Sequence, residues 1–326
     1  MKTKPKARVK TKSKLNPRTA RPAISDLMIT APPTSSLPRA ELVVLVNRLK
    51  ELSIERNHYV RTKTRLTNQM KSVARKILGK DNGEKVSDKE MGEFIDGCAE
   101  SGTTGAGLVP INVARKVISD NIRMVEKDIA SVVETLPIWT EWAQNISAVG
   151  KLTLGNIIGG SVCVTPPNGT GEAYTTIGDY ANPAKLWKRW GVGVIEGERQ
   201  RRVKASLEEK KNYCLTGEFT GDQAKAIRHG YSPERRSVLW FLGDGFVKQG
   251  RYYRRRYDQE KARQMEMHPE VMSDKFGNAK KKNYALLRAH NRAMRYATKL
   301  FLTDLWNKWR ELHGEGAFHR ASSERD

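Results

Sequence analysis

The hydrophobic repeat between Arg39 and Gly79 restricts what this chain can fold into more than any other stretch. Apolar residues recur there at steps of three and four, and a single seven-residue register describes the whole stretch. The two seam positions of that register hold Leu42, Leu49, Arg56, Lys63, Met70 and Ile77, and Leu45, Leu52, Tyr59, Leu66 and Val73. This spacing predicts one long helix that packs along a second helix.

A second repeat with the same spacing follows residue 110. It is formed by Ile118, Ile122, Val125, Ile129, Val132 and Leu136. The stretch between the repeats, residues 80–110, is rich in glycine and acidic residues, and its segment Ser101–Gly107 lacks the Gly-Lys-Ser/Thr ending of a phosphate loop. We therefore expect an antiparallel coiled-coil hairpin over residues 39–136, with residues 80–110 at its tip.

Two cations, Arg56 and Lys63, interrupt the first seam. A buried charge is costly in an apolar helix interface unless it is paired. The two side chains either specify the register of the packed helices or face phosphate where the helices separate, and the sequence leaves both interpretations open.

The N-terminal segment Met1–Pro22 contains nine Lys or Arg residues and no acidic residue. Such a composition buries too little apolar surface to offset the entropy of an ordered chain. We expect residues 1–38 to be a disordered basic tail and a proline-rich linker. The tail is interpreted either as a nucleic-acid tether or as a solubilising or targeting segment.

Charge indicates the class of partner. The 326 residues carry a formal net charge of +23, with 38% hydrophobic residues to build a core. Such an excess of cations favours a polyanionic partner, and nucleic acid before membrane, because no lipidation motif or apolar run of spanning length is present. Three widely spaced cysteines, Cys98, Cys163 and Cys214, form no CxxC pair and predict no metal site. We expect a soluble, cytoplasmic protein with no membrane partner.

The stretch Asn145–Arg202 predicts a compact helical module with a basic arm. Gly150, Gly155, Gly159 and Gly160 stand among aliphatic residues, a pattern suited to two close-packed helices joined by a tight turn. Asn182 and Pro183 predict the start of a helix that has Leu186 and Trp190 on one face. Further along, Ser232 and Pro233 predict another helix start, and residues 280–313 a last helix.

Three segments of this module resemble known nucleic-acid-binding proteins. They are Ile146–Gly150, Asp179–Gly193 and His229–Leu239. Together they are similar to the Nop domain of box C/D ribonucleoproteins and to the C-terminal domain of bridge-RNA-guided insertion-sequence recombinases. In architecture, the chain resembles most the Nop-domain Tas proteins of tandem-interspaced-guide-RNA systems, in a form without an appended nuclease.

The resemblance covers about residues 40 to 313 and implies a mainly all-α fold, with a coiled-coil hairpin that forms a homodimer and a Nop-like RNA-binding domain at residues 137–326. It implies a small guide RNA as the bound component, with target DNA recognised through guide pairing and without cleavage, in a prokaryotic or phage-encoded system. The alternatives are a bridge-RNA-guided transposase or recombinase that lacks its acidic catalytic domain, and a structural ribonucleoprotein scaffold.

Basic residues of the module are the predicted RNA contacts. They are Lys185, Lys188, Arg189, Arg199, Arg201, Arg202, Lys204, Arg228, His229, Arg235, Arg236, Arg251, Arg254, Arg255 and Arg256. Three tyrosines among the last of these cations, Tyr252, Tyr253 and Tyr257, predict base stacking or, as the alternative, a solvated helix with tyrosines packed beneath it.

The sequence offers only weak candidates for a catalytic site. The nucleophilic serine of the recombinases would fall near Glu218–Thr220, where no serine is present and Thr220 is a poor substitute. His290 with Asn291 lacks the pattern of a ββα-metal nuclease, and Cys214 with His229 lacks the signature of a thiol enzyme. We expect no catalytic residues, no metal and no cofactor other than RNA.

Overall fold

The computed structural model describes residues 37–77, a few positions between 87 and 97, and residues 108–163, 174–195, 198–199, 232–249, 251–268 and 279–314. The helices are α1 (Arg39–Ile77), α3 (Leu108–Glu134), α4 (Pro137–Glu141), the 3-10 helix η2 (Ala143–Asn145), α5 (Lys151–Ser161), α6 (Pro183–Arg189), α9 (Pro233–Gln249), α10 (Tyr252–Met267) and α12 (Ala279–Leu312). A short antiparallel pair, β1 (Val194–Ile195) and β2 (Glu198–Arg199), follows α6. The prediction of a mainly α-helical fold is confirmed.

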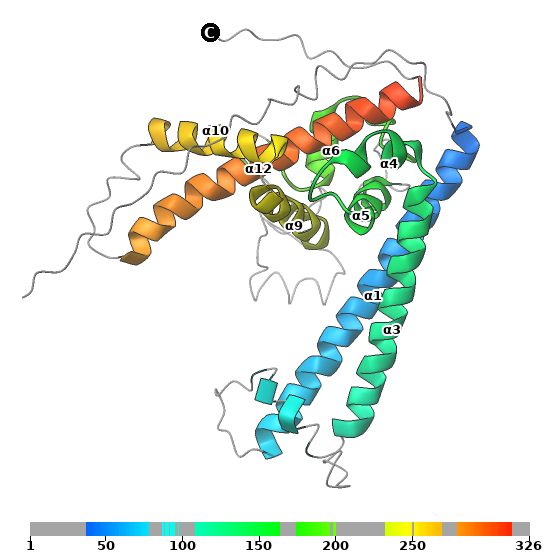
Figure 1. The fold of residues 1–326 in the computed structure, drawn as a ribbon, viewed down its shortest axis with the longest axis vertical. Helices are drawn as coiled ribbons and strands as arrows, with labels where there is room; N and C mark the ends of the chain where they lie inside the picture. Colours follow the sequence, from blue (N-terminus) through cyan, green and yellow to red (C-terminus); the bar gives the residue numbers. More distant parts are fainter. Residues whose placement is uncertain are drawn as a thin grey trace, which may run out of the picture. The chain divides into compact units, whose positions relative to one another are not determined.

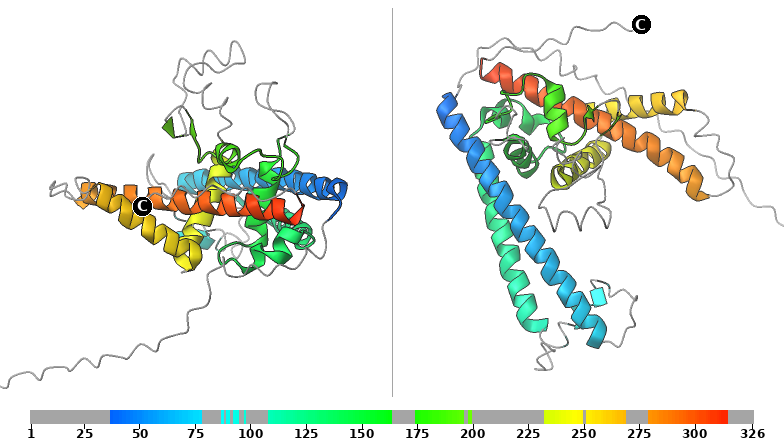
Figure 2. Two further views of the ribbon diagram at one scale, coloured as in Figure 1. Left: turned by 90° about the horizontal axis from the view of Figure 1, so that it is seen from above. Right: turned by 180° about the vertical axis from the view of Figure 1, so that it is seen from behind.

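Helices α1 and α3 lie side by side and antiparallel (Figures 1 and 2). Leu49, near the start of α1, and Ile129, near the end of α3, both approach the same glycine of α5. At the other end of the pair, Met70 of α1 forms a small buried cluster with Leu108, the first residue of α3. The predicted pair of long helices is therefore present, while its coiled-coil character stays a prediction.

Helix α5 crosses both members of this pair through its glycines. A Cβ atom at Gly159 would lie 2.7 Å from the backbone carbonyl carbon of Leu49, and one at Gly155 would lie 2.5 Å from a methyl group of Ile129. Such distances are accessible only to a residue without a side chain. The close packing expected here is thus present. A tight turn follows η2, where the backbone N–H of Val149 donates to the Ile146 carbonyl at 3.1 Å, and residues 151–161 then form one continuous helix that begins after Gly150.

Helix α6 begins as its sequence predicts. The Asn182 side chain accepts a hydrogen bond from the backbone N–H of Lys185 at 3.1 Å, and Pro183 occupies the first turn. Leu186 and Trp190 are buried on one face, as expected. The Trp190 indole N–H donates to the hydroxyl of buried Ser161, which fixes α6 on the end of α5.

The last helices pack through aromatic rings. Tyr253 of α10 stacks on Phe246 of α9, and both contact Phe301 of α12. Helix α12 also reaches the segment before α6, because the Trp306 indole donates to the Tyr180 carbonyl at 2.8 Å. The long α12 crosses α10 and α9 in Figure 1 and so joins the C-terminal helices to the rest of the core. In the described part of the chain, no helix is both long and apolar enough to cross a bilayer.

Candidate nucleic-acid interface

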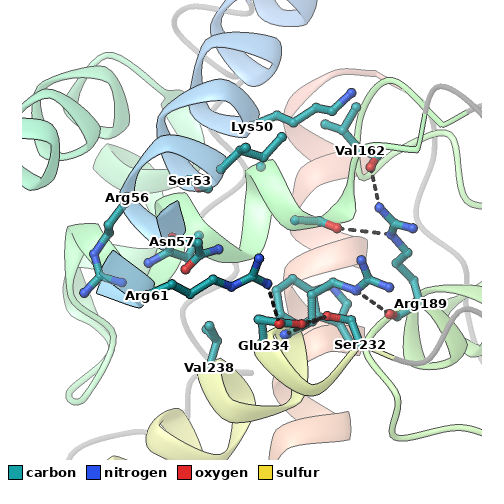
Figure 3. Close-up of a pocket in the computed structure, with 16 residues that line it drawn as sticks. Lys50, Ser53, Arg56, Asn57, Arg61, Val162, Arg189, Ser232, Glu234 and Val238 are labelled. Carbon is teal, nitrogen blue, oxygen red and sulfur yellow. Dashed lines mark hydrogen bonds and ion pairs between the residues drawn. The ribbon is translucent and has the colours of Figure 1, made fainter. Parts of the chain in front are cut away.

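A cleft of about 250 Å³ opens where α1, α5, the end of α6 and the start of α9 meet (Figure 3). Its walls come from segments that are far apart in the sequence. They are formed by Lys50, Ser53, Ile54, Arg56, Asn57, Arg61, Asn156, Gly159, Gly160, Val162, Arg189, Trp190, Ser232, Glu234, Arg235 and Val238. Five of these side chains are cationic and one is a carboxylate, so the cleft carries a strong positive potential.

Two adjacent glycines allow the walls to approach. Gly159 faces the backbone of α1, whereas a Cβ atom at Gly160 would lie 3.0 Å from the Trp190 ring and 3.7 Å from Cδ of Arg235. Gly159 therefore allows α1 to pack closely on one side of α5. Gly160 allows the end of α6 and the start of α9 to pack closely on the other side.

Two of the five cations are paired with carboxylates. Arg56 of α1 contacts Glu126 of α3, with 2.6 Å between Nη2 and Oε1, and Arg61 contacts Glu234 of α9 at 2.6 Å. The Arg56 pair links the two long helices, as the register interpretation of this seam cation predicts. Because Arg56 also lines the cleft, the phosphate interpretation stays open.

Arg189 and Arg235 are held against the backbone at the opposite wall. Arg189 donates to the carbonyl oxygens of Gly160 at 3.1 Å and Val162 at 2.6 Å, and Arg235 donates to the carbonyl of Arg189 at 2.9 Å. Burial, and then the neighbouring charge of Arg189, lower the pKa of Arg235 to about 10. Arg235 is therefore charged at neutral pH, and these hydrogen bonds fix both guanidinium groups in place.

Glu234 is stabilised in its ionised form. Burial raises its pKa, but its own backbone N–H, the Ser232 hydroxyl and Arg61 together lower the pKa below its ordinary value. Ser232 also accepts a hydrogen bond from the backbone N–H of Arg235 at 3.3 Å, which confirms the predicted helix start. The positive end of α9 is thus already neutralised by a carboxylate.

The α1 wall contributes polar residues that the sequence interpretation missed. Lys50, Ser53, Asn57 and Arg61 follow one another at steps of three, four and four, the spacing of one helix face. That spacing is the signal in the sequence, but an ordinary solvated helix face shows the same pattern. The sequence analysis followed the apolar seam and made no prediction for these four residues.

The predicted RNA contacts divide into those in the cleft, those elsewhere and those outside the described residues. Arg189 and Arg235 line the cleft, and Arg236 donates to the carbonyl of Gly191 at 2.7 Å. Lys185 is half-buried and Lys188 is exposed on α6. The residues Arg201, Arg202, Lys204, Arg228, His229 and the side chain of Arg199 lie outside the described part of the chain, as do Thr220 and Cys214.

Helix α10 presents a separate group of cations. Arg251 precedes it and Arg255 lies on it, both exposed, while Arg254 contacts Asp258 at 2.7 Å. The Arg256 guanidinium lies over the Tyr252 ring, with 5.4 Å between its carbon and the ring centroid. Arg255 and Arg256 are exposed. Arg254 is half-buried and donates to the Val247 carbonyl, so within this group it resembles the cleft arginines most.

The tyrosines of α10 require a correction. Tyr253 and Tyr257 are 5% and 2% exposed, so their rings pack on protein side chains and not on bases. The Tyr253 hydroxyl donates to Asp304 of α12 at 2.8 Å, and the Tyr257 hydroxyl bonds to His290 at 2.7 Å. The alternative interpretation, a solvated helix with tyrosines packed beneath it, describes this pair. Tyr252 alone of the three is half-buried.

Exposed aromatic rings are found instead on α9. Trp240 is 50% exposed and Phe241 67% exposed, and their centroids lie 5.3 Å apart in an edge-to-face contact. Because the buried face of α9 is formed by Leu239, Leu242 and Phe246, the intervening rings point to solvent, where they could stack on bases.

No arrangement of catalytic groups emerges among the described residues. His290 lies within α12 and bonds to Tyr257, and burial lowers its pKa. In the part of the chain that the structure covers, no group of three His, Cys, Asp or Glu side chains could hold a metal ion. Comparison of the chain with family models, with curated proteins and with solved structures found no match.

Proposed function

We propose that this protein binds RNA and forms a ribonucleoprotein. The observation that carries the proposal is the cleft, in which cations from α1, α6 and α9 converge and are held by hydrogen bonds. Pre-positioned guanidinium groups suit phosphate oxygens, and a net charge of +23 supplies long-range attraction for a polyanion. The exposed Trp240 and Phe241 add rings on which unpaired bases can stack.

The RNA-guided part of the proposal rests on the sequence resemblance. Two of its segments contribute to the cleft: Asp179–Gly193 contains α6, and the described part of the third segment, residues 232–239, begins α9. The first segment, Ile146–Gly150, leads into α5, which lines the cleft further along. We propose that a small guide RNA lies against this surface and pairs with target DNA, without cleavage by this chain. In that arrangement, base pairing selects the sequence and the protein contacts the backbone.

The homodimer expected from the hairpin is also a proposal. Leu52, one of the seam leucines, is 1% exposed and belongs to the core of one chain, so a charge there would test folding and not dimerisation. Val113, Val117 and Met124 of α3 are more than half exposed and are better positions. Replacing these three by glutamate should convert a dimer to a monomer in light scattering. An unchanged mass in a folded variant would place the interface elsewhere.

Sequencing of the nucleic acid that copurifies with the protein tests the proposed function. A discrete small RNA with repeated boundaries supports a guide. Incubation of that complex with matched DNA and Mg²⁺ or Mn²⁺ should then give binding without nicking. DNA nicking or strand transfer would favour the recombinase alternative, and bound RNA without DNA recognition would favour the scaffold.

A further inference from the structure

One wall of the cleft carries a buried polar side chain, Ser53. It is 7% exposed, and among the described residues its hydroxyl finds no hydrogen-bond partner. A helical serine or threonine usually donates to the carbonyl four residues earlier. On the same helix, Thr62, Thr64 and Thr67 all do so, at 2.9 to 3.0 Å. A buried hydroxyl that is left without a partner lowers stability, so its retention at the cleft wall points to a bound group that supplies the partner.

The charges around Ser53 indicate an anion as the bound group. Lys50 lies one turn before Ser53, and within the part of the chain that the structure describes it forms no ion pair or hydrogen bond. Arg189 donates to backbone carbonyls of Gly160 and Val162, and these carbonyls do not neutralise its charge. Figure 3 shows the Lys50 side chain extending toward Val162, whose carbonyl accepts from Arg189. Lys50 and Arg189 therefore place their positive charges at the same part of the cleft. The Glu234 carboxylate pairs with Arg61 instead.

Size limits what the anion can be. The volume of about 250 Å³ is below the roughly 300–1,000 Å³ of pockets that enclose drug-sized ligands. One side is closed where α5 touches the backbone of α1 at Gly159. A small cleft closed on one side accepts the end of a strand more readily than its middle. A terminal phosphate also carries a charge of about −1.5 to −2, against about −1 for an internal phosphodiester, which suits the positive charges of Lys50 and Arg189.

We propose that the cleft binds a phosphate monoester of the kind that ends an RNA strand. Lys50 and Arg189 supply the positive charge, and the Ser53 hydroxyl donates to a phosphate oxygen. This inference rests on the proposed function for the source of the phosphate, but the site itself can be tested without RNA.

The test uses the full chain and one short RNA sequence made with a 5′-phosphate, a 3′-phosphate or hydroxyl ends. Fluorescence anisotropy should show a preference for one phosphorylated end of about tenfold, the size of one charge-assisted hydrogen bond. Ser53→Ala and Lys50→Gln should each reduce the preference to about twofold or less. Ser72→Ala and Lys76→Gln are matched controls, since both residues are exposed on α1 and do not line the cleft; they should keep the full preference.

Thermal unfolding separates a binding role for Ser53 from a structural one. Ser53→Ala removes a buried hydroxyl without a partner, so its Tm in chloride should equal or exceed that of the parent protein. Inorganic phosphate, compared with chloride at equal ionic strength, should raise the Tm of the parent protein and not that of Ser53→Ala. A lower Tm for Ser53→Ala in chloride, with no response of the parent to phosphate, would overturn the site.

The two proposals fail in different ways. If phosphate raises the Tm but no RNA binds, the phosphate site stands, free phosphate or a nucleotide is its ligand, and the proposed function falls. If RNA binds with no preference for any end and phosphate does not change the Tm, the function stands and the phosphate site is overturned.

Discussion

Two groups of arginines in this protein differ in how they are held, although their side chains are the same. At the cleft, Arg189 and Arg235 donate to backbone carbonyls between α5, α6 and α9. On α10, Arg255 is exposed and Arg256 lies over a tyrosine of its own helix. The fold therefore holds the cleft arginines in place, whereas Arg255 and Arg256 of α10 are exposed. In the proposed function, the cleft arginines contribute to both fold and binding, and these two α10 arginines mainly to binding.

This difference shows why counting cations does not locate a site. A guanidinium group fixed by backbone carbonyls loses little further entropy when it meets a phosphate, so it contributes shape selectivity. An exposed arginine on a single helix contributes attraction that is screened by salt and blind to sequence. The predictions below test this division.

The largest expected effect comes from the crossing that builds the cleft. Gly159→Ala would place a methyl group 2.7 Å from the carbonyl carbon and oxygen of Leu49, where backbone and not a side chain must move. We expect a loss of about 3 kcal/mol in the free energy of unfolding, together with weaker RNA binding. Urea titration measures the first quantity.

Gly150→Ala is the control for this substitution, because nothing lies within 4 Å of its Cβ position. It should cost less than about 1 kcal/mol, the usual effect of alanine at a helix N-cap. Equal losses for the two variants would show that α5 does not depend on close contact with α1.

The second prediction concerns the buried side of α10. Burial raises the pKa of Asp304 to about 6, although the Tyr253 hydroxyl and Arg256 oppose the shift. The folded protein therefore holds a proton between pH 4 and 6 that the unfolded chain has released. Stability should fall by about 2 kcal/mol as the pH rises through this window. Asp304→Asn keeps an acceptor for Tyr253 and should remove this part of the decline in denaturation curves measured against pH.

An unchanged pH profile in Asp304→Asn would mean that the carboxyl group titrates normally, and that α10 is not held to α12 through this bond. The substitution should change RNA affinity at pH 8 by less than about threefold, because Tyr253, the partner of Asp304, is buried and does not face solvent.

The third prediction compares the two groups of arginines directly. Arg189→Lys keeps the charge but loses the planar fork that reaches the Gly160 and Val162 carbonyls, so stability should fall by about 1–2 kcal/mol. Arg255→Lys, at an exposed position, should change stability by less than about 0.5 kcal/mol. If thermal unfolding shows equal losses of stability for the two variants, the two groups of arginines do not differ in how much they stabilise the fold.

The smallest effect on stability is expected for α10. Replacing Arg254, Arg255 and Arg256 by glutamine should leave the Tm within a few degrees and lower the slope of log affinity against log salt by about two units, at about 0.7 per single-strand phosphate contact. Anisotropy titrations over a range of salt concentrations give the slope. If this variant keeps the salt slope of the parent protein, RNA does not contact these arginines of α10.

Much of the fold follows from local signals in the sequence. The three-four repeat identifies α1 and α3, the Asn182–Pro183 pair begins α6, and Ser232 begins α9. Each signal acts within one or two turns of helix, so neighbouring residues suffice to predict it.

The cleft depends on contacts that no local pattern encodes. Gly159 is recognisable as a close-packing residue, but its partner, the α1 backbone at Leu49, is 110 positions away. Likewise Lys50 and Ser53 become binding candidates only once Arg189 is known to face them across the cleft. The sequence leaves base stacking and packing both open for Tyr253 and Tyr257, because the residues that cover them, such as Phe301, Asp304 and His290, lie in another helix.

The central claim is that a shaped RNA site, and not charge alone, binds the guide. It is tested most directly by the affinity of the protein for its copurified RNA against an unrelated RNA of equal length, before and after Lys50→Gln with Arg189→Lys. We predict a preference for the copurified RNA that this cleft variant loses, while its affinity for the unrelated RNA changes by less than about threefold. Equal affinity of the parent protein for both RNAs, or an unchanged preference in the folded variant, would contradict the account.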